Sequence, residues 1–245
     1  MISRNSASRH AFAAVKLAVL AMAAGVSAPA SLAASAEQPA AVVELFQSQG
    51  CSSCPPANAN VIALSDRPEL LTLSFGVTYW DDLGWKDTFG SPKYTDRQWD
   101  YAHAFSRKQV FTPEVVVNGR ADVVGTNRTE LETLIKRVAE PGANQPKVQV
   151  NENSATVSAW NGDVQKADVW LVRYDPNIVE VPIGRGENGG RTLPHKNVVK
   201  ELVRLGDWLG TERSYDFPAA TRAGLREAIL VQAGAGGPII ASGRD

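Results

Sequence analysis

The sequence predicts an α/β domain followed by a small all-β, sandwich-like domain. Two observations predict the first part: short apolar runs alternate with helix-like segments up to residue 139, and a C-x-x-C motif follows the first run. A third observation predicts the second part, because only short β-like segments follow the linker-like stretch 140–146, which contains two prolines and a glycine. We therefore expect two domains, over residues 37–141 and 142–245.

The first 36 residues have the pattern of a secretory signal peptide. Three basic side chains and no acidic one accompany an apolar run over residues 17–26, and Ala34-Ser35-Ala36 offers a cleavage pattern of small residues. The run is too short to count as a spanning helix, although an uncleaved anchor is the alternative. We expect a periplasmic or secreted protein with no membrane span after cleavage of residues 1–36.

Charge and composition are those of an ordinary globular protein. The 245 residues are 44% hydrophobic and 21% charged, with a formal net charge of −1. Loss of the first 36 residues leaves 22 basic and 26 acidic side chains, a net charge of −4. Clustered Lys and Arg, which mark a nucleic-acid interface, are missing from the sequence, so we expect no nucleic-acid partner.

The alternating segments of the first half can be placed in order. Two prolines at 55 and 56 favour a helix start, Asn118-Gly119 is a hairpin turn signal, and Asn127 is a candidate N-cap. The expected elements are strand 41–46, helix 57–65, strand 70–78, helix 93–109, strands 114–118 and 121–124, and helix 129–139.

This order predicts which residues meet at one edge of the sheet. Strands 41–46 and 70–78, joined by a helical crossover, should be parallel, so their carboxyl ends share an edge. If strand 114–118 is antiparallel to them, it begins at that edge. Cys51, the stretch 79–82 and Pro113 then converge.

The second half consists of β-like segments separated by Asn, Gly and Pro. Several short strands at this spacing favour a small sandwich, although residues 198–205 also suit a helix. The segments are 147–151, 155–160, 167–174, 177–183, 197–205, 213–217 and 227–233.

Cys51 and Cys54 are the two cysteines of the chain, and they lie three residues apart after a predicted buried strand. A C-x-x-C at the start of a helix is a redox arrangement, because the helix N-terminus favours the attacking thiolate of Cys51 and Cys54 can resolve the mixed disulfide. Two alternatives stay open. One is a permanent structural disulfide, and the other is a metal site, for which two thiolates supply half a zinc shell or suffice for cuprous copper.

Phe111-Thr112-Pro113 stands before the strand at 114, and with the preceding strand, C-x-x-C, helix, strand and helix it resembles the thioredoxin superfamily. The resemblance implies an α/β thioredoxin-like domain in which Pro113 is cis, lies against the cysteines and precedes an antiparallel strand. It also implies that Thr112 offers backbone groups to an extended substrate and that Glu44 moves protons at the resolving cysteine. A salt-bridged, structural Glu44 is the alternative.

A narrower resemblance covers nearly the whole chain after the signal segment. It is to a bacterial family of secreted proteins of unknown function, and it implies a thioredoxin-like domain with a C-terminal β extension but no established activity. The segments that carry it are Val42–Phe46, Ser48–Pro56, Tyr79–Asp81, Leu83–Trp85, Thr112-Pro113, Gly184–Asn188 and Leu205–Trp208.

Two further segments have a functional and a structural interpretation. Trp80 and Asp81 open a loop that either forms a substrate-binding lip beside Cys51 or is packed by its tryptophans. The glycine-rich segment 184–191 is either a plain hairpin loop or one that folds back over the cysteines and shapes access to them. His103 and His195 lack metal-ligand spacing and are expected to be structural or solvated, so we predict no metal residues.

These observations lead to one functional hypothesis and two alternatives. We expect an exported thiol–disulfide oxidoreductase that needs no cofactor and exchanges electrons with protein thiols or disulfides, or with a partner dithiol. A non-enzymatic binding module with a structural disulfide is the first alternative. Copper handling is the second, and it is disfavoured because both methionines lie in the first 36 residues.

Overall fold

The computed structural model describes residues 1–2, 38–139 and 145–245. The predicted signal peptide at 1–36 therefore lies almost wholly outside the described residues. The predicted domain boundary between residues 141 and 142 also lies outside the described residues. The signal peptide and the domain boundary therefore stay predictions. No helix in the described part of the chain is long and apolar enough to cross a membrane.

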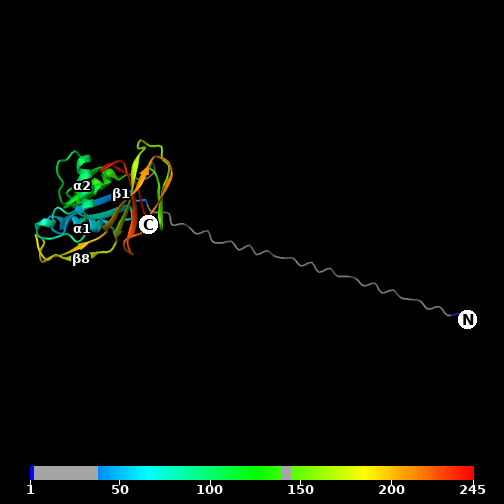
Figure 1. Cartoon of the computed structure of the whole chain (residues 1–245), viewed down its shortest axis with the longest axis horizontal. Helices are drawn as coiled ribbons and strands as arrows, with labels where there is room; N and C mark the ends of the chain where they lie inside the picture. The colour runs from blue at the N-terminus through cyan, green and yellow to red at the C-terminus, as the bar shows by residue number, and fades with distance from the viewer. Residues whose placement is uncertain (3–37, 140–144) are drawn as a thin grey trace. The chain divides into compact units, whose positions relative to one another are not determined.

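The architecture is a mixed α/β fold around one large sheet (Figure 1). Eight strands follow each other in the order β13-β12-β7-β10-β2-β1-β3-β4. The elements of the first half are β1 Ala41–Gln47, α1 Cys54–Leu64, β2 Leu70–Gly76, a 3-10 turn at Asp81–Leu83, α2 Pro92–Ala104, β3 Glu114–Val117, β4 Ala121–Val123 and α3 Arg128–Val138.

Strands β1 and β2 form the centre of the first half because most of their side chains are apolar, and every residue of both strands is buried. They are parallel, with Ala41 beside Leu70, and β3 runs antiparallel to β1 with Glu114 beside Phe46. The predicted strand directions are confirmed. The carboxyl ends of β1 and β2 and the start of β3 therefore lie at the same edge.

Alternation along β1 separates two layers of helices. Val43 and Leu45 pack in one cluster with residues of α1 and α3, whereas Val42 and Phe46 pack in another with Tyr101 of α2. The helices thus cover opposite faces of the sheet. This layering decides which side chains of β1 can reach the start of α1.

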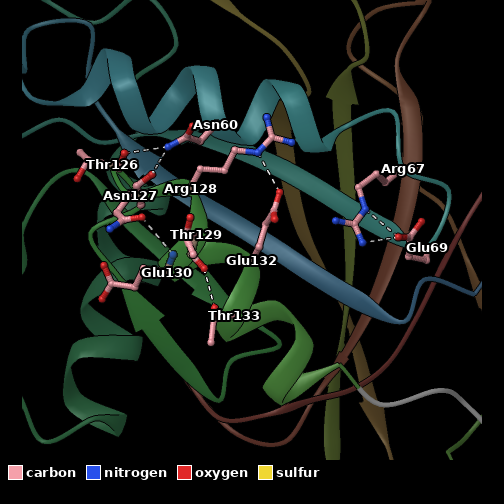
Figure 2. A network of polar contacts seen from close by, with 11 residues as sticks. Asn60, Arg67, Glu69, Thr126, Asn127, Arg128, Thr129, Glu130, Glu132 and Thr133 are labelled. Atoms are coloured by element: carbon pink, nitrogen blue, oxygen red, sulfur yellow. Dashed lines mark hydrogen bonds and ion pairs between the residues drawn. The ribbon is translucent and has the colours of Figure 1, made fainter.

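Polar contacts fix α3 beside α1 (Figure 2). Asn60 of α1 donates hydrogen bonds to the carbonyls of Gly125 and Thr126, at 2.9 and 3.0 Å. Asn127 then caps α3 as predicted, because its side chain accepts from the amide of Glu130 at 3.2 Å. Asn60 and Asn127 together set where the chain turns from β4 into the helix.

The second half contributes four strands to the same sheet and three to a smaller one. The joining strands are β7 Ala167–Asp175, β10 Val198–Trp208, β12 Arg226–Gln232 and β13 Ile239–Arg244. The smaller sheet has β5 Val148–Asn151, β6 Ser154–Val157 and β11 Arg213–Asp216. A separate hairpin pairs β8 Val179–Pro182 with β9 Thr192–His195.

Two sheets of the second half pack against each other, and the larger of them extends into the first half. Residues of β7 and β12 that face the smaller sheet alternate with residues that join the α2-side core, so two sheets do pack face to face. However, Val198 of β10 pairs in parallel with Ser74 of β2, which makes the larger sheet continuous across both halves. Residues 35–245 form one unit, because the open edge of β2 is covered by a strand from the second half.

Candidate functional site

The cysteine pair lies where β1 ends and α1 begins. Cys51 and Cys54 form a disulfide with their Cα atoms 5.4 Å apart. Their exposed fractions are 0% and 1%, although Ser52 and Ser53 between them are exposed. The site is therefore an oxidised pair whose sulfur atoms are covered by other parts of the chain.

The predicted convergence at this edge is present in the structure. The Thr112–Pro113 peptide bond is cis, as the superfamily resemblance implies, and Pro113 is buried. The hydroxyl of Ser53 lies 3.4 Å from Cys51 Sγ and donates to the Thr112 carbonyl at 3.5 Å. Trp80 donates its indole N–H to the Thr112 hydroxyl at 2.8 Å. Segments following β1 and β2 thus meet the residue that precedes β3.

The loop after β2 is held by carboxylates that accept backbone hydrogen bonds. Asp81 accepts from the amide of Asp87 at 3.0 Å, and Asp87 accepts from the amides of Gln49 and Phe89, each at 2.7 Å. Burial raises the pKa of Asp87 to about 6, against the lowering effect of its two amide donors. Asp81 therefore stabilises the loop through a backbone hydrogen bond. That Asp81 also contacts the substrate stays a prediction.

Gln49 is a site residue that the sequence analysis missed. Its side chain is fully buried, accepts from the Trp85 indole N–H at 2.9 Å and donates to the Thr88 hydroxyl at 2.8 Å. One side chain thus ties the loop after β2 to the backbone two residues before Cys51. No motif signals this role, since glutamine before a C-x-x-C reads as an ordinary polar residue.

The glycine-rich loop of the β8–β9 hairpin lies on the cysteine segment. Asn188 donates to the carbonyls of Gln49 and Cys51, both at 2.9 Å, and it is itself fully buried. Glu187 accepts from the amide of Ser52 at 3.1 Å. Of the two interpretations of segment 184–191, the structure therefore bears out the one in which the loop folds over the cysteines.

Glu44 does not lie beside the cysteines. Since Val43 and Leu45 pack toward α1, the Glu44 side chain points to the opposite face, where α2 lies. There its carboxylate accepts from Arg97 Nε at 2.7 Å and from the Tyr101 hydroxyl, and all three side chains are buried. The proton-carrying role implied for Glu44 is corrected to the alternative, a structural ion pair.

The histidines behave as predicted for structural residues. His195 is buried at the end of β9, where its ring packs edge-on against Phe89 and contacts Asn58 of α1. Burial, together with the charge of Lys200, lowers the pKa of His195 to about 4, so it is neutral near pH 7. The His103 ring lies tilted against Trp99 on α2, with 5.5 Å between the ring centroids. Among the described residues, no group of three His, Cys, Asp or Glu could hold a metal ion.

Fold and site define a mixed α/β protein with a C-x-x-C disulfide at the N-terminus of a helix. The chain belongs to the family described as "Protein of unknown function (DUF1223)", whose model matches residues 42–232. The expected membership in a family of unknown function is confirmed. A comparison with curated proteins found no match.

Three solved chains resemble this one. The crystal structure of protein AGR_C_4864 from Agrobacterium tumefaciens is 28% identical, with a TM-score of 0.68 over 85% of this chain and 94% of that one. HBP35 of Porphyromonas gingivalis is 13% identical, with a TM-score of 0.54 over 86% of this chain and 76% of that one. The second likeness concerns the fold alone.

Proposed function

We propose that this chain is an exported thiol–disulfide oxidoreductase in which a thioredoxin-like part carries the redox-active pair Cys51 and Cys54. The observation that carries the proposal is the position of the pair. It lies at the first turn of α1, and Ser53 between the cysteines contacts both Cys51 and the Thr112 carbonyl next to cis-Pro113. A disulfide that only stabilises the fold does not require a position at a helix N-terminus beside the Thr112 carbonyl.

The start of α1 favours a thiolate once the pair is reduced. The first turn of α1 contains no acidic residue of its own, so its side chains leave the partial positive charge of the helix N-terminus in place, although the exposed Glu187 carboxylate on the Ser52 amide acts against it. The Ser53 hydroxyl, 3.4 Å from Cys51 Sγ, can turn from the Thr112 carbonyl and donate its one hydrogen bond to an anionic sulfur. Both features lower the cost of charge on Cys51 and so favour exchange.

The exchange can be written from the oxidised state in the structure. A thiolate of a partner dithiol attacks Cys51 Sγ, the Cys51–Cys54 bond breaks, and Cys54 leaves as a thiolate that takes up a proton. The partner's second thiolate then attacks the partner's first sulfur, which is bonded to Cys51 Sγ in the mixed disulfide. The partner departs with a disulfide, and Cys51 is released and protonated. Two electrons and two protons pass to the protein, and no cofactor takes part.

The proposed partners and location follow from this chemistry and from the signal-like segment. Protein thiols or disulfides, or a recycling dithiol, exchange with the pair in the periplasm or outside the cell. An oxidising compartment keeps a C-x-x-C pair in the disulfide state between turnovers. Thr112 and Trp80 are proposed to border the substrate, since Trp80 binds the Thr112 hydroxyl beside the cysteines.

A second candidate has one observation in its favour. Because both cysteines are buried, the pair also fits a structural disulfide in a non-enzymatic binding module. The two candidates differ in whether a dithiol can open the bridge in the folded protein.

Disulfide transfer to a dithiol peptide tests the proposal. Oxidised protein is mixed with an excess of a reduced peptide containing two cysteines, and both products are alkylated and weighed. We expect one peptide disulfide to form for each Cys51–Cys54 pair reduced, and none with the C51S/C54S double variant. A pair that stays oxidised while the protein remains folded would leave the structural disulfide as the function of this bridge.

A further inference from the structure

One short segment, residues 184–190, here called the strap, hydrogen-bonds to the backbone on both sides of Cys51. Its ends are joined by backbone hydrogen bonds from Ile183 to the Arg191 carbonyl and from Gly190 to the Ile183 carbonyl, both at 2.8 Å. The strap is therefore a closed loop on the end of the β8–β9 hairpin, beside α1 (Figure 1).

At the tip of the strap, the side-chain amide of Asn188 uses nearly all of its hydrogen-bonding capacity. Its amide nitrogen donates to the Gln49 and Cys51 carbonyls, and its amide oxygen accepts from Arg191 Nη1 at 2.6 Å. Both donated bonds end on backbone atoms that flank the first cysteine, and the amide is fully buried. This arrangement requires a donor at Nδ2, which an aspartate cannot supply.

The base of the hairpin is anchored independently of the tip. Val181, Ile183 and Leu193 form a small apolar cluster with Trp85 and Phe89 of the loop after β2. At the tip, by contrast, the contacts to the cysteine segment are polar, and the Glu187 contact with the Ser52 amide is at the surface. Loss of the tip contacts can therefore free the strap while the base of the hairpin keeps its packing.

The strap lies close against Trp85 because Gly186, at the point of contact, has no side chain. Gly186 has φ of +77°, a conformation that suits glycine, and a Cβ at that position would lie 3.3 Å from Trp85 Cβ. The strap is thus shaped to lie on the loop that borders the cysteines.

From these contacts we infer that the strap is a gate, and that Asn188 holds it shut over the Cys51–Cys54 disulfide. The inference rests on the proposed function and adds to it how access is controlled. The strap occupies the carbonyls of Gln49 and Cys51 and the amide of Ser52. A polypeptide segment of a partner can bind these same backbone groups when the strap leaves.

The rate of reduction by dithiothreitol tests the gate. In the wild type we expect the rate to level off at high dithiothreitol, because opening of the strap becomes limiting. Asn188→Asp loses both donated hydrogen bonds and places an anion against two carbonyls, so its rate should rise by about tenfold or more and stay proportional to dithiothreitol. Asn153→Asp, the same change in the exposed β5–β6 turn, should match the wild type.

Two results would overturn the inference. One is an Asn188→Asp rate within about twofold of the wild type, and the other is a wild-type rate that shows no plateau. If Asn188→Asp loses its near-UV circular dichroism, Glu187→Ala replaces it, since Glu187 is exposed and alanine cannot accept from the Ser52 amide. Glu187→Ala should then accelerate reduction by about threefold, and an unchanged rate would reject the gate.

The equilibrium potential of the same two proteins separates this inference from the proposed function. If Asn188→Asp is reduced faster than the wild type but both proteins have a redox potential too low for exchange, the gate is supported and the oxidoreductase is rejected. If both proteins have an exchange-competent redox potential but equal rates of reduction, the gate is rejected and the oxidoreductase is kept.

Discussion

At the scale of single residues, a charged group lies deep in the apolar core. Arg97 of α2 donates to Glu44 of β1, to Tyr101 and to Gln232 of β12, and all four side chains are buried. Such a network tolerates the loss of a partner poorly, because the remaining charge is stranded away from water.

Glu44→Gln tests the role assigned to this carboxylate. We expect a loss of about 3 kcal/mol in the free energy of unfolding, since Arg97 keeps its charge without a counter-ion. The rate of disulfide exchange and its pH profile should be unchanged, because Glu44 faces α2. Glu132→Gln, at an exposed pair with Arg128, serves as the control and should leave urea unfolding as it is. An exchange profile that loses a titration step would restore Glu44 as a proton carrier.

Glu114 predicts a pH dependence of stability. Burial, with the nearby charge of Asp122 adding to it, raises the pKa of Glu114 from 4.5 to about 7, although a hydrogen bond from Gln98 opposes the rise. A folded-state pKa above the unfolded one means that this contribution to stability is complete below pH 4.5 and is lost as pH rises through 7.

Glu114→Gln should therefore flatten the profile. Relative to this variant, the wild type should lose up to about 3 kcal/mol of unfolding free energy between pH 4.5 and 8, measured by urea titration at each pH. Glu152→Gln, in the exposed β5–β6 turn, is the matched control. Parallel profiles for the wild type and Glu114→Gln would contradict the account.

Single residues also mark how far the sequence leads. The C-x-x-C spacing and the Thr-Pro before a strand identify Cys51, Cys54 and Pro113, because each has a local chemical signature. Asn188 has none: its partners lie 137 and 139 residues away, and only the folded chain brings them together. The predicted role of Glu44 beside the cysteines is wrong for a related reason. A shift of one residue along a strand moves a side chain to the other face of the sheet, and the sequence does not show which face Glu44 takes.

At the scale of elements, local signals predict most helices and strands to within a few residues. The clearest misses are β9 and β13. Pro194 interrupts β9, and a proline in a short run argues against a strand, although a hairpin edge accepts it. Gly243 in β13 weakens the strand pattern in the same way. Both strands depend on pairing partners that periodicity does not reveal.

The start of α3 gives a prediction at this scale. Asn127→Ala removes the side chain that accepts from the Glu130 amide and should lower the unfolding free energy by about 1 kcal/mol. Asn153→Ala, in an exposed turn, should change it little. Equal urea midpoints for Asn127→Ala and the wild type would show that the cap is replaced by water at no cost.

At the scale of the whole molecule, one core spans both halves of the chain. Phe46 and Leu71 of the first half pack in the same cluster as Val199 and Leu230 of the second. The sequence shows a change of pattern near residue 142 but not the pairing of β10 with β2, because alternation identifies a strand without naming its neighbour.

A shared core predicts that the halves unfold together. Leu230→Ala in β12 should cost about 3 kcal/mol and lower the hydrogen-exchange protection of β1 amides by the same free energy as those of β12. Leu209→Ala, at an exposed leucine, is the control. Unchanged protection of β1 in Leu230→Ala would show two independent folding units and return the fold to two domains.

The most direct test of the central claim is the redox potential of the Cys51–Cys54 pair. The purified protein is equilibrated in glutathione buffers, quenched by alkylation and weighed, so that each molecule is counted as oxidised or reduced. We predict a reversible couple between about −120 and −270 mV, the range of exchange-active thioredoxin-like enzymes. A pair that stays closed below about −300 mV would contradict the account and make the bridge structural.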